Sequence, residues 1–213
     1  MSVTVRGIQR ALHAYLSSHE YALPNYTPNG WFECDYYSVT KAGYAHEYEI
    51  KLTRSDFRAD AKKGSKGHYR VKDGRYMRDE RTKHELLAAG IDDAPKHFYF
   101  VVPTDLVALD EVPDFAGLIY AEKVHGRTML REQKRAPILS RTKVSESVVR
   151  QMARNASFRY WRLWLAEEYH NLPNKLDRLH DKLWAARYGS VEEKQGQIDK
   201  ALATLQSIRR ESE

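Results

Sequence analysis

The sequence lacks the features that crosslink a chain or anchor it in a membrane. Cys34 is the single cysteine among 213 residues, which excludes an intramolecular disulfide and any multi-cysteine zinc or iron–sulfur site. No apolar run approaches the roughly 18 residues that a membrane span needs. Arginine and histidine side chains interrupt the apolar residues of the N-terminal segment, which argues against a signal peptide. These absences predict a cytoplasmic protein without a membrane partner.

Positive charge is concentrated in one part of the sequence. The chain has a net charge of +6, and residues 51–85 contain 12 lysines or arginines against 6 aspartates or glutamates, so this segment carries the whole excess. Such a concentration favours a polyanionic partner, because each neutralised phosphate releases condensed counterions. On charge alone, a solvated charged surface is the alternative.

The first half of the sequence predicts a helix followed by a β-hairpin. Apolar residues at helical spacing predict a helix over 5–20, and the segment 23–30, LPNYTPNG, predicts a loop. Aromatic and β-branched residues predict strands over 31–40 and 44–53, joined by a three-residue turn that ends in Gly43.

The remaining sequence predicts an α/β core and a helical tail. Expected in order are a helix capped by Ser55, a glycine-rich basic loop over 64–76, a helix over 78–89 and strands over 97–102 and 116–121. Further helices are expected over 144–170, 174–188 and 191–213, the first ended by Pro173. We therefore expect a mixed sheet flanked by helices over residues 1–140 and an all-helical C-terminal extension over 141–213. The extension's helices are candidates for a homodimer contact.

The predicted hairpin brings acidic side chains together. Pairing Thr40 with Tyr44 sets Asp35 opposite Glu49, and alternation puts the acids and one lysine on a single face. This face contains Glu33, Asp35, Glu47, Glu49 and Lys51, and the other face, with Phe32, Cys34, Tyr36 and Tyr48, is expected to be core. Opposed carboxylates repel one another, but a hard divalent cation requires them. Asp35, Glu49 and the carbonyl of Ile50 are the expected metal ligands, and the alternative is an exposed polar face with a Glu–Lys pair.

These residues also carry a resemblance to a known family. The sequences ECD at 33–35 and EYEIK at 47–51 resemble the signature of the PD-(D/E)XK nuclease superfamily. HEYEIKLTRSDFRADAKK, HFYFVVP and VPDFAGLIY are similar to a phage and bacterial group, the MmcB-like DNA repair endonucleases. The resemblance implies an αβββαβ core and Mg²⁺-dependent phosphodiester hydrolysis in a bacterial or phage-infected cell, with Mn²⁺ able to substitute. It implies Asp35 and Glu49 as metal ligands and Lys51 as the catalytic lysine.

Further residues are expected around this centre. Glu33, Glu47 and Glu20, the last at the end of the first helix, are candidate auxiliary ligands. Basic residues follow Lys51 and are expected to contact DNA phosphates, which positions a duplex without reading its sequence: Arg54, Arg58, Lys62, Lys63 and Lys66.

The sequence thus predicts a metal-dependent DNA nuclease, taken as an endonuclease with exonuclease activity left open. The alternative is a catalytically inactive module on the same fold that binds nucleic acid or protein. An RNA-directed enzyme is a weaker alternative, because the sequence has no RNP-like aromatic motif.

Overall fold

A computed structural model describes residues 2–61, 69–72, 75–78 and 80–188, with short pieces at 195–196, 199–200 and 202–203. The chain divides into two compact units, residues 1–156 and 157–213. The first unit extends beyond the expected boundary at residue 140, because Val148 and Met152 pack with the core residues of the sheet.

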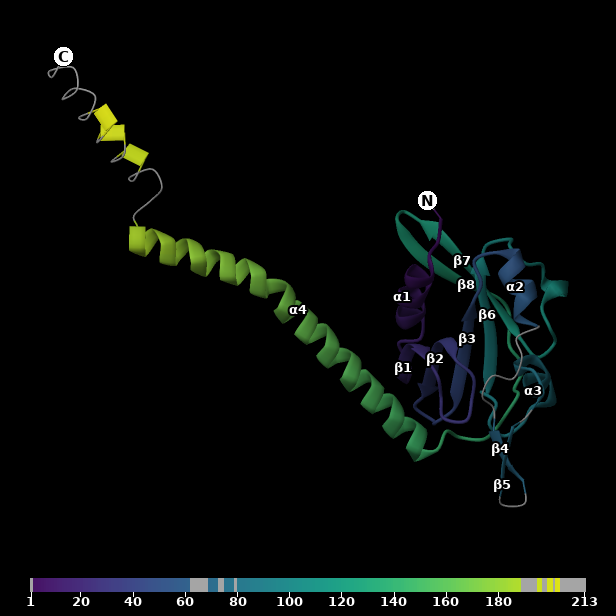
Figure 1. The fold of residues 1–213 in the computed structure, drawn as a ribbon. Coiled ribbons are helices and arrows are strands. Elements are labelled where there is room, and N and C mark those ends of the chain that lie inside the picture. The colour runs from purple at the N-terminus through teal and green to yellow at the C-terminus, as the bar shows by residue number, and fades with distance from the viewer. Residues whose placement is uncertain are drawn as a thin grey trace, which may run out of the picture. The chain divides into compact units, whose positions relative to one another are not determined.

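The first unit is built on a six-stranded mixed sheet of order β1-β2-β3-β6-β7-β8 (Figure 1). Two parallel pairings, β3 with β6 and β6 with β7, lie in the middle, and the outer pairings are antiparallel. The chain therefore has an α/β fold. The strands are β1 (His19–Tyr26), β2 (Cys34–Thr40), β3 (Ala45–Ile50), β6 (His97–Pro103), β7 (Gly117–Val124) and β8 (Arg127–Lys134).

Helices cover both faces of this sheet. In Figure 1, α1 (Val5–Tyr15) lies on one face, and α2 (Arg54–Asp60) and α3 (Lys83–Ala89) lie on the other. The central strand β6 shows why both faces are covered, since its residues alternate between two apolar clusters. Phe98 and Phe100 pack with the α3 side, while Tyr99 and Val101 pack with α1. Such a strand is buried on both faces, as expected for parallel pairing.

The first predicted helix is too long, and a strand follows it. The helix ends at Tyr15 with Leu16 as C-cap, and residues 19–26 form β1. Pro24 lies inside this strand, which is tolerated because β1 is at the edge of the sheet and an edge strand has unpaired N–H positions. Glu20 is therefore an exposed residue of β1 and not the last residue of a helix.

The predicted hairpin register is confirmed, but the predicted faces are wrong at the start of β2. Tyr36 pairs with Tyr48 and Val39 with Ala45. Continued by one residue, this register sets Asp35 opposite Glu49, as predicted. Cys34, however, packs with Tyr37 and Val39 instead of Tyr36. Alternation is interrupted at Asp35, whose carboxylate accepts the backbone N–H of Ile50 in β3.

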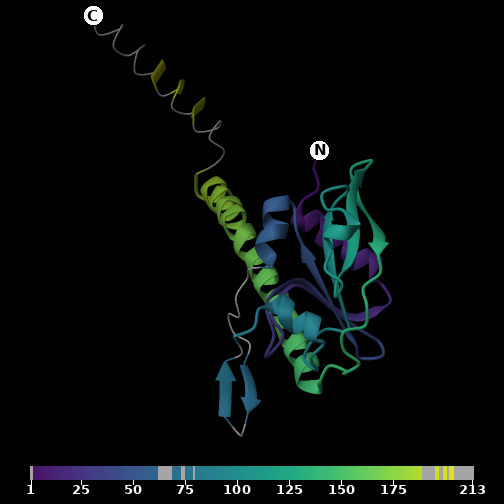
Figure 2. The same cartoon turned by 90° about the vertical axis from the view of Figure 1, so that its right-hand side faces the viewer.

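Several boundaries also differ. Thr53, not Ser55, caps α2, since its side chain accepts from the N–H of Asp56. The expected loop over 64–76 contains β4 (Tyr69–Lys72), which pairs with β5 (Arg75–Arg78) in a separate two-stranded sheet (Figure 2). The helix expected from residue 78 begins at Lys83, after a capping box formed by Thr82 and Glu85, and ends at Gly90 as predicted. Strand β8 was not predicted.

The C-terminal region begins with one long helix, α4 (Glu146–Tyr188). It continues through Pro173, so the expected break between 170 and 174 is wrong. The helix expected over 191–213 lies mostly outside the described residues. Among the described residues, no helix is long and apolar enough to cross a membrane.

Close packing between β6 and β7 generates a stability prediction. A Cβ at Gly117 would lie 2.4 Å from two ring atoms of Tyr99 and 2.7 Å from the backbone nitrogen of Ala136. We expect Gly117→Ala to lower the free energy of unfolding by about 1–3 kcal/mol, because the overpacked core must shift. Urea unfolding measures this. Gly196→Ala is the control, since its Cβ meets no described atom within 4 Å. Equal stability of the two variants would contradict the packing described.

Candidate active site

The acidic residues of β3 point to the covered side of the sheet. Glu47 pairs with Phe98 and Glu49 with Phe100, and those phenylalanines belong to the cluster under α3. Glu47 is 0% exposed, Glu49 5% and Lys51 2%. Charges removed from water are unfavourable unless each has a partner, so the contacts of these side chains decide what the cluster can do.

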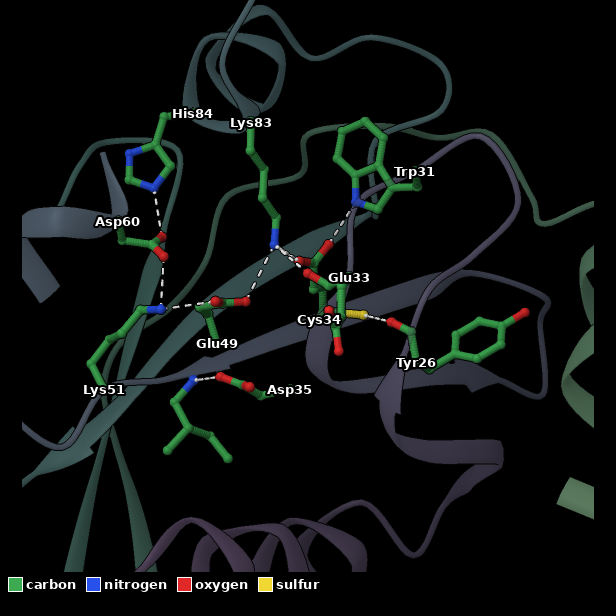
Figure 3. A network of polar contacts seen from close by, with 12 residues as sticks. Tyr26, Trp31, Glu33, Cys34, Asp35, Glu49, Lys51, Asp60, Lys83 and His84 are labelled. Carbon is green, nitrogen blue, oxygen red and sulfur yellow. Dashed lines mark hydrogen bonds and ion pairs between the residues drawn. The ribbon is translucent and has the colours of Figure 1, made fainter. Parts of the chain in front are cut away.

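Lys51 is held between two carboxylates. Its Nζ lies 2.8 Å from Glu49 Oε1 and 2.7 Å from Asp60 Oδ1 (Figure 3). Asp60 is the last residue of α2 and is itself buried. Its other carboxylate oxygen lies 2.9 Å from Nε2 of His84 in α3. Asp60 thus connects Lys51, which follows β3, to α2 and α3, the two helices in the crossover from β3 to β6.

A second lysine, Lys83, reaches the same acids from α3. Its Nζ forms an ion pair with Glu47 Oε1, lies 3.2 Å from Glu49 Oε2 and donates to the carbonyl oxygen of Glu33 at 3.3 Å. Trp31 Nε1 donates to the other oxygen of Glu47 at 2.8 Å. Each oxygen of Glu49 therefore contacts a different ammonium group (Figure 3).

Asp35 lies at the margin of this network and is partly buried. Its Oδ2 accepts the N–H of Ile50 at 2.7 Å. Burial raises the pKa of Asp35, and the nearby charge of Glu49 raises it further, although the Ile50 N–H and the two lysines oppose the shift. The structure places the N–H of Ile50 against Asp35, and the Ile50 carbonyl as a metal ligand stays a prediction.

Both lysines are charged at neutral pH. Burial alone lowers the pKa of Lys83, but Glu47 and Glu49 outweigh it and the net shift is upward. The pKa of Lys51 is raised in the same way by Glu49 and Asp60, against the effect of burial. Burial raises the pKa of Glu49, but the two lysines lower it more strongly, so Glu49 is ionised.

Carboxylates outnumber lysines in the network. Two ammonium groups contact the three carboxylates of Glu47, Glu49 and Asp60, and Asp35 lies at the margin as a fourth, which leaves two carboxylates more than lysines. Burial raises the pKa of Glu47 and of Asp35, which disfavours the ionised form of both. A divalent cation would supply compensating charge for the excess carboxylates.

The donor groups at this position suit Mg²⁺, which keeps several water ligands, better than an ion that is held entirely by protein side chains. Within the described ranges, no group of three or more histidine, cysteine, aspartate or glutamate side chains converges to hold a metal ion. Mg²⁺, however, binds through one or two carboxylates and keeps several waters for substrate phosphates. Asp35 and Glu49 supply two such carboxylates. A carboxylate has about four lone-pair sites and can accept several partners at once.

The structure separates the expected auxiliary acids. Glu47 joins the network, whereas the Glu33 residue is exposed and contributes its carbonyl oxygen to Lys83. Glu20 lies on β1, separated from β3 by β2, and does not join the site.

Sequence reasoning missed three members of the network, Asp60, Lys83 and His84. Two of them carried a usable signal. Lys83 is the first residue of a helix and Asp60 the last residue of one, where the helix dipole disfavours a cation and an anion respectively. A charge at the unfavourable end of a helix indicates a tertiary partner.

The expected DNA-contacting residues are only partly described. Arg54 forms an ion pair with Glu111 and its side chain is 49% exposed. Arg58 is exposed on α2. Lys62, Lys63 and Lys66 lie outside the described residues.

Comparisons with known proteins bear on the fold alone. No family model matches the chain, and no curated protein matches it. A solved structure, a protein of unknown function from Silicibacter pomeroyi, is similar with a TM-score of 0.51 and 17% identity. The similarity covers 78% of this chain and 96% of the other. It shows a shared α/β fold with a mixed sheet and flanking helices.

The buried ion pairs generate a stability prediction. We expect Asp60→Ala to lower the free energy of unfolding by about 3–5 kcal/mol, because it leaves Lys51 buried with one carboxylate fewer. Urea unfolding measures the change. Asp56→Ala on the same helix is the control, since Asp56 is exposed and its loss costs about 1 kcal/mol or less. A difference of less than 1 kcal/mol between the variants would argue against a network that stabilises the fold.

For Asp35 we expect the opposite effect, a gain in stability when its charge is removed. Its pKa is raised on folding, so its negative charge destabilises the fold at neutral pH. Without divalent ions, Asp35→Asn should increase the free energy of unfolding at pH 7 by roughly 0.5–1 kcal/mol, while its amide oxygen still accepts the Ile50 N–H. The gain should shrink as the pH falls through the raised pKa and vanish below the ordinary aspartate range. Thermal unfolding between pH 7 and pH 3 tests this, with exposed Asp114→Asn as the control. A loss of stability at pH 7 would contradict it.

Proposed function

We propose that this protein is a Mg²⁺-dependent DNA nuclease that hydrolyses phosphodiester bonds, with a core of the PD-(D/E)XK type. The observation that carries the proposal is the buried carboxylate–lysine network at the end of β3, in which the four carboxylates of Asp35, Glu47, Glu49 and Asp60 outnumber two ammonium groups. A purely structural ion network has no need of that excess.

The position of the network in the sheet supports the proposal. The sheet changes from antiparallel to parallel pairing at β3, and Glu49 and Lys51 lie at the carboxyl end of that strand. Ligands of α/β sheets bind outside the carboxyl ends of parallel strands. With β1 included, the order α1, β1, β2, β3, α2, β6 follows the αβββαβ core that the sequence resemblance implies, although β4, β5 and α3 also lie in the crossover.

Each residue has a role in this proposal. Asp35 and Glu49 would hold Mg²⁺ or Mn²⁺, which when bound activates a water and stabilises charge on the phosphate. Lys51, held in place by Asp60, would orient the attacking water or neutralise the developing negative charge. Arg54 and Arg58, both on α2, would contact the phosphate backbone of DNA and position the duplex. Endonucleolytic cutting is part of the proposal.

One observation favours a second candidate, a catalytically inactive binding module. Both oxygens of Glu49 are already paired with lysines, so the network can join α2 and α3 to the sheet without any cation. In this case the basic residues that follow Lys51 would bind nucleic acid without cleaving it.

The homodimer stays a prediction for the C-terminal helices. Exposed apolar side chains occur on the described part of α4, with Phe158 67%, Trp161 53% and Leu163 72% exposed. They are compatible with a helix-pair contact and do not by themselves select a partner.

Plasmid cleavage tests the proposed function. Purified protein and supercoiled DNA are incubated with Mg²⁺, Mn²⁺ or EDTA, and nicked and linear products are quantified. We expect metal-dependent cutting, and we expect Lys51→Ala and Asp35→Ala each to reduce it by about 10²- to 10⁴-fold, because each removes charge stabilisation or metal binding. Glu20→Ala is the control and should keep full activity, since Glu20 is exposed on β1. Circular dichroism establishes that each variant is folded.

The possible outcomes separate the candidates. Cutting that survives both substitutions would show that the active site lies elsewhere. No cutting by the wild type, with duplex binding retained in a salt-dependent manner, would favour the binding module.

A further inference from the structure

Lys83 occupies a cage of oxygen atoms. Its ammonium group contacts carboxylate oxygens of Glu47 and Glu49 and the backbone carbonyl of Glu33. The cage is closed, because the side chain of Lys83 is 6% exposed and that of Glu47 is 0% exposed. Two carboxylates and a carbonyl form the kind of donor set that binds hard divalent cations.

The lysine is brought into this cage by a well-defined local structure. Lys83 is the first residue of α3, directly after Thr82, and the capping box of Thr82 with Glu85 sets where the helix begins. The N-terminal end of a helix is unfavourable for a cation, so the helix itself does not stabilise Lys83 there. The two glutamates supply the compensating charge.

Asp35 and Lys83 approach Glu49 from different elements. The Asp35 carboxylate is on β2 and bonds to the β3 backbone, whereas the Lys83 ammonium comes from α3 and contacts Glu49 Oε2 (Figure 3). An ion held by Asp35 and Glu49 would share only Glu49 with the Lys83 cage, whose other oxygens come from Glu47 and the carbonyl of Glu33. Entry into the cage would require a cation to lose most of its water, which Mg²⁺ does reluctantly.

We propose that the Lys83 ammonium group takes the place of a second divalent cation, so that this site binds one metal ion, between Asp35 and Glu49. This inference rests on the proposed metal-dependent function and specifies the number of ions. Glu47 then serves to hold Lys83 and is not a metal ligand in the wild-type protein.

Metal stoichiometry without DNA tests the inference. Mn²⁺ binding is measured by electron paramagnetic resonance of the free ion and by titration calorimetry. We expect one Mn²⁺ per wild-type chain and two for Lys83→Met, whose vacated oxygens accept the second ion. The double variant Lys83→Met with Glu47→Gln should return to one, because one carboxylate of the cage is lost.

Lys134→Met is the matched control. The ammonium of Lys134 donates to the carbonyl oxygens of Val112 at 3.0 Å and Pro113 at 3.1 Å, so its removal vacates backbone acceptors but no carboxylates. It should bind one Mn²⁺, as the wild type does.

Stability provides a second measurement, because Lys83→Met leaves two carboxylates buried with reduced compensation and weakens the fold. We expect its melting temperature to be below that of the wild type in EDTA and to rise more steeply with Mn²⁺ than that of the wild type or the double variant.

Each result has a definite meaning. Two ions in the wild type, or one ion in folded Lys83→Met, would overturn the inference while leaving a metal-dependent site in place. If Lys83→Met does not fold even with Mn²⁺, the wild-type stoichiometry decides: one ion supports the inference and two overturn it. No Mn²⁺ bound by the wild type would instead overturn the proposed metal site itself.

Discussion

Two buried lysines, Lys51 and Lys83, join the crossover helices to the central strand β3 through shared carboxylates. Removing these charges from water costs several kcal/mol for each ion, and the cost is offset only when every partner is in position. The docking of α2 through Asp60 and of α3 through Lys83 is therefore coupled to the register of the sheet. Such pairs require close agreement of position, because a charge that loses its partner stays buried without compensation.

The same network explains why stability and the proposed chemistry are opposed at this position. Lys51 and Lys83 contact the carboxylates of Glu47, Glu49 and Asp60, and Asp35 lies at the margin of the network, where burial and the charge of Glu49 raise its pKa. A partly buried carboxylate with a raised pKa is typical of functional sites, where a ligand can supply compensating charge. In the proposed function that ligand is a divalent cation.

Local sequence patterns predicted the parts of the fold that depend on neighbouring residues. The turn ending in Gly43 and the strand pattern around it gave the correct β2–β3 register, and the apolar run of β6 was correctly identified. Strand β1 was missed because Pro24 and the turn-forming residues near it resemble a loop, and only the edge position makes them compatible with a strand. Strand β8 was missed because its residues are mostly polar and partly exposed.

The sequence by itself determined that Glu47, Glu49 and Lys51 lie on one face of β3, since side chains alternate along any strand. It also determined where the positive charge is concentrated. Only the tertiary structure decided that this face is buried and that Asp60 and Lys83 complete it. Lys83 contacts Glu49 across 34 residues of sequence, and such a contact depends on how the crossover helices dock on the sheet. Strand periodicity acts within one element, whereas docking is set by the packing of apolar and charged groups from several elements at once.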